Sequence, residues 1–434
     1  MGRGILKTIV LSLDGLLDDV YEELGNKTPL EYANTKNLDK ILQNGSCGLM
    51  NSYMAGVPKI SYEDTFVISG YPKELFPGMG VIKALGEDLE IKDNTIYMEC
   101  FFVPVLKDED GFRVINRVNN DILEDDLNKI RDCIPNYYEG YEFHLQKCKN
   151  STCVISMSDK SGWISDKISD SDPYFQGRHV QKIVPVKELC STEPEYRRAE
   201  STANALNKFL LRIHKLLDSN EVNEKRKRRG KYPINFMLTK FAGKQVELPS
   251  FQEKTGMKTI SISDFSQAKG FSKLLKWDYL IVNDSKEVFQ NSIKYLEYYD
   301  LIYAKTTYLK DSCLKYAPFE KVSEIEKLDS YLEPFTNLEN VLIIITSNKV
   351  YPFLGTLVNS GDPYSIIVSG KNVRRDDTPT FNEKNCYKGN LRIKYDELLN
   401  IILNYTNKAL LNGLRPGPNL IKYIPNDEDL EHLQ

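Results

Sequence analysis

The chain has 434 residues, of which 41% are hydrophobic and 27% are charged, and its formal net charge is -4. This length predicts more than one domain, and the small net charge speaks against a globally basic nucleic-acid-binding protein. The eight cysteines include no CxxC pair, so we expect reduced thiols and a cytoplasmic protein. No apolar run reaches the roughly 18 residues that a membrane span needs, so we expect no membrane contact.

The first expected element is a buried parallel strand over 5–13, which is rich in Ile, Leu and Val. Asp14 follows at its carboxyl end, where open α/β sheets place their ligands. Ser61 follows a turn that contains Gly and Pro, and it opens an apolar, helix-like run that ends at Gly70. This is a suitable place for a nucleophile, because the first amides of a helix face an incoming phosphate. A helix-capping serine explains the same position.

The pattern changes between about 106 and 189, where polar helices alternate with strand-like runs. We therefore expect a smaller α+β cap domain over 106–189, inserted into a core that is formed by 1–105 and 190–434. A long amphipathic helix is expected over 195–217. The remaining strands of the core are expected at 259–262, 279–282, 300–304, 341–345 and 364–368. This order predicts a three-layer α/β core with a mainly parallel sheet.

Several blocks of sequence are found together in one known family. They are Asp14-Gly15, Lys27-Thr-Pro-Leu-Glu31, Ser61 shortly before Gly70-Tyr71, Ser171-Asp-Pro173 and Arg229-Gly-Lys-Tyr-Pro-Ile-Asn235. Over nearly its whole length the chain resembles the archaeal type of 2,3-bisphosphoglycerate-independent phosphoglycerate mutase, in the alkaline phosphatase superfamily. The resemblance implies an alkaline-phosphatase-like core and a serine that becomes phosphorylated while 2- and 3-phosphoglycerate interconvert. It also implies two divalent metal ions, manganese or zinc, that activate the serine.

The resemblance assigns the nucleophile to Ser61 and a metal-binding aspartate to Asp14, and Asp311 stands near the place of another. The family's Asp-His pair falls on Ser347-Asn348. The four histidines are at 144, 179, 214 and 432, and none lies at an expected strand end of the core. Because metal sites of this type need imidazole and carboxylate together, we expect the metal site to be lost. Ser61, Asp14 and Asp311 would then be remnants, and no cofactor is expected unless the protein is active.

The densest basic run covers 225–231. In the family this region contributes to binding phosphate and carboxylate, which arginine contacts in a bidentate manner. The resemblance therefore implies substrate contacts for Arg228, Arg229, Lys231 and Asn235, and also for Arg117 in the cap. A phosphorylated small molecule is the expected ligand. RNA binding and a solvated helix end are the alternatives for the same run.

Three functions follow from these observations. The first is a degenerate, non-catalytic mutase-like protein that acts as a binding or structural partner, with a protein or ribonucleoprotein as its partner. The second is an active mutase of glycolysis with a rearranged metal site built from Asp14, Ser61, Asp64 and Asp311. The third is an RNA- or ribosome-associated protein that uses the run 225–231.

Overall fold

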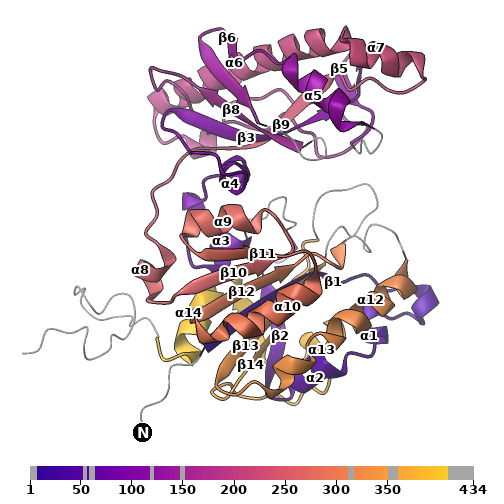
Figure 1. The fold of residues 1–434 in the computed structure, drawn as a ribbon, viewed down its shortest axis with the longest axis vertical. Coiled ribbons are helices and arrows are strands. Elements are labelled where there is room, and N and C mark those ends of the chain that lie inside the picture. Colours follow the sequence, from indigo (N-terminus) through magenta and orange to yellow (C-terminus); the bar gives the residue numbers. More distant parts are fainter. Residues whose placement is uncertain are drawn as a thin grey trace, which may run out of the picture. The chain divides into compact units, whose positions relative to one another are not determined.

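The computed structural model describes residues 7–51, 56–57, 64–117, 122–146, 152–310, 317–349 and 360–408. The chain divides into two compact units (Figure 1). Unit 1 consists of Met1–Leu75 and Leu248–Gln434, and unit 2 consists of Phe76–Glu247. The expected boundaries at 105/106 and 189/190 are therefore wrong. Strand β3 (Thr95–Val103) and helix α6 (Glu193–Asp218), both assigned to the core, belong to unit 2, since β3 pairs with unit 2 strands and α6 packs on one of them.

Unit 1 is built on an eight-stranded sheet in the order β11-β10-β12-β1-β13-β14-β2-β15. The strands are β1 (Lys7–Leu17), β2 (Gly45–Asn51), β10 (Thr259–Ser263), β11 (Asp278–Ile281), β12 (Leu301–Thr306), β13 (Val341–Lys349), β14 (Tyr364–Ser369) and β15 (Leu391–Lys394). Strand β14 is antiparallel to both of its neighbours, and the other pairs are parallel. The central strands are almost continuously buried, as expected of a parallel sheet that is covered on both faces.

Helices cover both faces of this sheet (Figure 1). On one face, α2 (Lys36–Leu42), α10 (Ser285–Lys294) and α12 (Pro318–Ser330) bury the main hydrophobic core of the unit. The other face is covered by α3 (Asp64–Ile68), α9 (Ala268–Leu275) and α14 (Leu398–Tyr405). The other α-helices in the described part of the unit are α1 (Pro29–Tyr32), α8 (Phe251–Thr255) and α13 (Glu383–Cys386). The expected three-layer α/β core with a mainly parallel sheet is thus confirmed.

Unit 2 contains a five-stranded antiparallel sheet in the order β6-β7-β8-β3-β9. Besides β3, its strands are β6 (Tyr137–Tyr138), β7 (Tyr141–Leu145), β8 (Thr152–Ser158) and β9 (Phe236–Gly243), and a separate hairpin joins β4 (Val105–Asp108) and β5 (Gly111–Val114). Its helices are α4 (Met79–Gly86), α5 (Glu124–Asp132), α6 and α7 (Glu221–Arg228). Phe209 of α6 stacks on Phe143 of β7 with 3.6 Å between the ring centroids. This antiparallel sheet with its helices is the expected α+β domain, although it is larger than predicted.

The apolar residues of the longer helices are buried in the hydrophobic cores of their own units. Among the described residues, no helix combines the length and the apolar character that crossing a bilayer requires.

Strand β1 lies at the centre of the sheet, and its carboxyl end makes a sharp change of direction. Gly15 has a φ of +86°, and a side chain there would place its Cβ 3.0 Å from the carbonyl carbon of Leu309. The pairing with β13 is irregular between Asp14 and Leu17. A glycine is therefore required directly after Asp14, which fixes that carboxylate at the end of the regular strand.

A buried polar network follows β1. The ammonium of Lys321, a residue only 1% exposed, forms an ion pair with Asp18 and donates to the carbonyl oxygen of Leu17 at 3.3 Å. The Glu383 carboxylate accepts from the Thr28 hydroxyl at 2.8 Å and from the Asp18 amide at 3.3 Å. Burial raises the pKa of Glu383 to about 7, although these hydrogen bonds oppose the shift. Glu383 therefore gains its charge within the neutral range.

We predict that Glu383→Gln reduces the pH dependence of stability. Because the pKa of Glu383 is higher in the folded than in the unfolded protein, the folded state binds more protons between about pH 4.5 and 7. Its stabilising contribution is complete below the unfolded pKa and is lost as the pH rises through about 7. Between about pH 5.5 and 8, the wild type should lose about 2 kcal/mol more unfolding free energy than the variant. Urea denaturation at a series of pH values measures this difference, with the exposed Glu333→Gln as control, and an unchanged pH profile in Glu383→Gln would contradict it.

Candidate functional site

The carboxyl edge of the unit 1 sheet gathers polar side chains from adjacent strands. In the strand register, Ser12 of β1 lies opposite Lys305 of β12, and Leu13 lies opposite Ser347 of β13. Asp14 follows within β1, three residues before its last residue, Leu17. The strand is therefore longer than expected, and Asp14 lies where its regular pairing with β13 stops.

Asp14 forms a buried ion pair with a residue that the sequence analysis did not single out. The distance from Asp14 Oδ2 to Lys305 Nζ is 3.0 Å, and the two side chains are 7% and 8% exposed. The Ser12 hydroxyl donates to Asp14 Oδ1 at 3.3 Å. The sequence does contain a sign of this pair. Lys305 is a single lysine within the apolar strand Leu301–Thr306, where a charge normally needs a partner.

Two further polar groups at this edge are already engaged by the strands around them. Asp264 accepts from the Thr306 hydroxyl at 2.5 Å and from the Thr307 amide at 3.0 Å. Burial raises the pKa of Asp264, and the neighbouring charge of Asp14 raises it further. The Ser347 hydroxyl, at the place where the family has an aspartate, donates to the Ser365 carbonyl at 3.1 Å. Ser347 is thus a structural residue of the sheet.

The other residues expected in this site cannot be placed. Ser61 and Asp311 lie outside the described residues, and Asp64 begins helix α3 without a described side chain. Their roles remain predictions from the sequence.

The described residues at this edge do not fit a dinuclear manganese or zinc centre. Residues 1–75 and 248–431 contain no histidine, so the described residues of unit 1 offer no imidazole at the sheet edge. Among the described groups, Asp14 is neutralised by Lys305 and Asp264 has a raised pKa. Two divalent ions need several ionised carboxylates or imidazoles close together, and these groups do not provide them.

Unit 2 contains its own cluster of buried charges, around Arg117. The Arg117 guanidinium contacts both oxygens of Asp172, with 2.7 Å from Nη2 to Oδ2. The Asp172 side chain is fully buried and that of Arg117 is 7% exposed. The Arg117 side chain lies over the Phe101 ring, and its buried Nε has no acceptor among the described groups. An orphaned donor of this kind indicates a place for an additional acceptor.

Lys240 belongs to the same cluster, and the sequence analysis missed it. In the sheet register Lys240 of β9 lies opposite Glu99 of β3, and its ammonium lies 3.9 Å from Glu99 and 4.0 Å from Asp172. Two neighbouring aromatic residues, Tyr174 and Phe241, have φ values of 62° and 56°. Bulky residues rarely adopt this left-handed conformation, and such strain is typical of functional sites.

The remaining anion-binding candidates occupy other positions in unit 2. The Asn235 side chain accepts from the Val105 amide at 2.9 Å and donates to Asp218 at 2.9 Å, so it is used within the fold. Asn235 and Lys240 are five residues apart on one chain, which corresponds to roughly 16 Å along a strand. Arg228, Arg229 and Lys231 are exposed at the end of α7.

The basic run itself is partly neutralised. Lys225 pairs with Glu221 at 2.5 Å and Lys227 pairs with Glu224 at 3.2 Å. Arg226 is only 7% exposed and donates to the Tyr232 carbonyl at 3.0 Å. An RNA contact would therefore depend mainly on Arg228, Arg229 and Lys231, and it stays a prediction.

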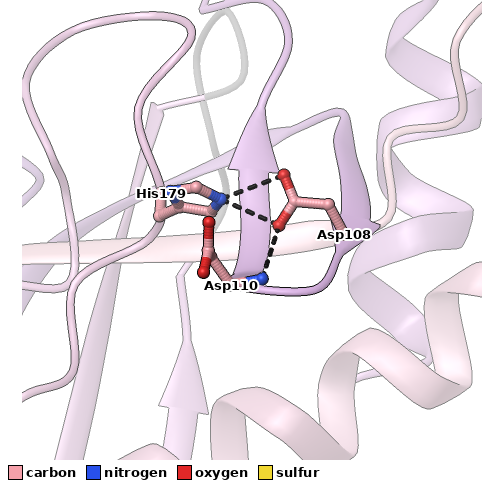
Figure 2. A group of neighbouring side chains, drawn as sticks. All are labelled: Asp108, Asp110 and His179. Atoms are coloured by element: carbon pink, nitrogen blue, oxygen red, sulfur yellow. Dashed lines mark hydrogen bonds and ion pairs between the residues drawn. The ribbon is translucent and has the colours of Figure 1, made fainter.

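A cluster of Asp108, Asp110 and His179 lies at the β4–β5 hairpin (Figure 2). His179 Nε2 lies 2.9 and 3.0 Å from the two oxygens of Asp108. Arg113 forms an ion pair with the same carboxylate at 2.8 Å, and the amides of Asp110 and Gly111 donate to it. The hydrogen bond from His179 and then the bonds from Arg113 and the Asp110 amide hold the pKa of Asp108 at about 2. These contacts around Asp108 stabilise the β4–β5 hairpin, and this structural role explains the cluster.

Comparisons with known proteins agree with this fold and also identify a family of similar sequences. A model of the 2,3-bisphosphoglycerate-independent phosphoglycerate mutase family matches residues 43–223. The chain is 42% identical to 2,3-bisphosphoglycerate-independent phosphoglycerate mutase 2 of Methanocaldococcus jannaschii, over 99% of this chain and 100% of that protein. It is 30% identical to the mutase of Methanococcus aeolicus, over 93% of this chain and 99% of that protein.

Solved structures show the same fold. A protein from Pyrococcus horikoshii matches with a TM-score of 0.70 at 22% identity, over 93% of this chain and 97% of that chain. The cofactor-independent phosphoglycerate mutase from Thermoplasma acidophilum matches with a TM-score of 0.59 at 24% identity, over 92% and 99% of the two chains. From the sheet, the helical layers and the full-length similarity to M. jannaschii mutase 2, we conclude that this chain belongs to the 2,3-bisphosphoglycerate-independent phosphoglycerate mutase family.

Proposed function

We propose that this protein is an active phosphoglycerate mutase that interconverts 2- and 3-phosphoglycerate. The observation that carries the proposal is the 42% identity to the M. jannaschii mutase, which extends over the whole of that protein. Similarity of this extent to a protein named as a mutase favours an enzyme over the non-catalytic relative that the histidine count suggested. In this reaction the Ser61 hydroxyl accepts the phosphoryl group of the substrate and returns it to the other hydroxyl of the glycerate.

The Arg117 cluster of unit 2 supports substrate binding. Phosphoglycerate is an anion at neutral pH, and Arg117 and Lys240 are cations that lie beside aromatic rings in a largely buried setting. The Arg117 Nε that has no acceptor among the described groups would donate to a carboxylate or phosphate oxygen of the ligand. Buried cations discriminate strongly for anions because water does not screen them.

No step of this reaction is assigned to a metal ion, because the described residues of the sheet edge do not fit the dinuclear metal centre that the family implies. Within those residues, the cation next to Asp14 is Lys305. The same pair favours a second candidate function, a protein that binds phosphoglycerate without turning it over. That candidate retains the Arg117 cluster and lacks the activation of Ser61.

We predict that the purified full-length protein converts 3-phosphoglycerate to 2-phosphoglycerate and that Ser61→Ala reduces kcat at least about 1,000-fold, because the acceptor hydroxyl is removed. Phosphorus NMR of the substrate mixture, with manganese in one sample and a chelator in another, measures the conversion directly. Ser69→Ala is the matched control, since the Ser69 hydroxyl only donates to the Thr65 carbonyl within the same helical turn.

The two candidate functions give different results in this experiment. Conversion of 3-phosphoglycerate that disappears in Ser61→Ala supports the mutase, whether it occurs with manganese or with the chelator. Binding of 3-phosphoglycerate without conversion in both samples supports the non-catalytic function and contradicts the proposal.

A further prediction concerns Lys240. Lys240→Met keeps an apolar stem against Phe101 and Phe241 but removes the charge, and it should weaken 3-phosphoglycerate binding by about 10- to 100-fold. Isothermal titration calorimetry measures this change. Lys244→Met removes a half-exposed lysine four residues away, which lies 3.9 Å from Asp166, and should change the affinity less than about twofold. Equal affinities of the wild type and Lys240→Met would exclude Lys240 from the substrate site.

A further inference from the structure

We infer that Lys305 supplies the positive charge that neutralises Asp14, in the position where the family implies a divalent metal ion. The inference stands on the Asp14–Lys305 pair and does not depend on turnover by the protein.

The pairing of the strands fixes the position of Lys305 in this ion pair. Lys305 lies in the interior of the sheet, opposite Ser12 of β1 on one side and Ser263 of β10 on the other. Its carbonyl oxygen accepts from the Ser263 hydroxyl at 2.8 Å. The backbone of Lys305 is thus held between two strands, and its side chain starts from a fixed position next to the end of β1.

Among the described groups, the Lys305 ammonium takes the place that a metal ion would need on Asp14 Oδ2. Lys305 Nζ lies 3.0 Å from Asp14 Oδ2, whereas a divalent ion would bind the same oxygen at about 2.0–2.2 Å. The other oxygen, Oδ1, accepts from the Ser12 hydroxyl. A divalent ion at either oxygen would stand within a few ångströms of the ammonium, and the two positive charges would repel each other in a buried setting.

On the side of Thr65 and Phe271, Lys305 has little room to move aside. The cavity next to its side chain has a volume of about 10 Å³, which corresponds to about one water molecule. Its lining includes Thr65, Ser261, Phe271 and Tyr303. An ammonium that left Asp14 would lose its buried counter-ion without gaining the water it needs, so the ion pair is expected to persist.

The composition of unit 1 agrees with this assignment. Residues 1–75 and 248–431 contain no histidine, and Asp14 lies where the pairing of β1 with β13 becomes irregular. A buried carboxylate without a counter-ion is strongly unfavourable. A lysine on the neighbouring strand satisfies that carboxylate at a sheet edge whose described residues do not fit the dinuclear centre.

The first test measures manganese binding to the full-length protein after treatment with a chelator. Wild type and Asp14→Asn are titrated with manganese by isothermal titration calorimetry. We expect the same stoichiometry and affinities within about twofold, because Asp14 holds no metal ion. A loss of one bound ion, or a tenfold or greater weakening in Asp14→Asn, would overturn the inference.

The second test is a double-mutant cycle on thermal unfolding in the presence of the chelator. Lys305→Met and Asp14→Asn should each lower Tm by about 5–10 °C, because each removes one half of a buried ion pair. The double variant should lose clearly less than the sum of the two shifts. Lys7→Met is the control, since Lys7 pairs with Asp300 at 3.4 Å in a partly exposed place, and a small shift is expected. Additive shifts would overturn the inference. If Lys305→Met does not fold, the manganese titration of the wild type and Asp14→Asn decides. If Asp14→Asn does not fold, the titration of the wild type decides, since two bound ions would overturn the inference and fewer would support it.

Discussion

The buried ion pair between Asp14 and Lys305 is the constraint on which the carboxyl edge of unit 1 depends. Both charges lie in the interior and neutralise each other there, which requires the strands that carry them to keep their register. A shift of one residue between β1 and β12 would turn one of the two side chains to the opposite face of the sheet. The pair therefore ties the electrostatics of the candidate site to the pairing of the central strands.

The α/β core was predictable because its strands are long apolar runs and Asp14-Gly15 marks the end of the first one. The domain boundaries were not predictable from the same signals. Strand β3 is as hydrophobic as a core strand, and nothing in its composition shows that its partners are the antiparallel strands β8 and β9. Helix α6 has an apolar stripe that fits either unit, so only its packing decides to which one it belongs.

The sequence predicted the site residues that can be recognised by their type. It did not predict those whose role depends on an ion pair with a residue of another strand. Arg117 was assigned from the family resemblance, and the structure adds its carboxylate partner Asp172. Lys305 and Lys240 were missed because each is a single lysine within an apolar strand, and its significance arises from a group on another strand. Asn235 matches a block of the family, yet its hydrogen bonds all lie within unit 2. Sequence similarity at such a position reflects folding requirements as much as ligand contacts.

The central place of β1 also affects the order in which the chain acquires structure during its synthesis. Strand β1 (Lys7–Leu17) pairs with β12 (Leu301–Thr306) and β13 (Val341–Lys349), so both of its edges stay uncovered until most of the polypeptide has left the ribosome. All of unit 2 emerges in that interval as one continuous segment. An apolar strand that emerges this long before its neighbours is an aggregation hazard during synthesis.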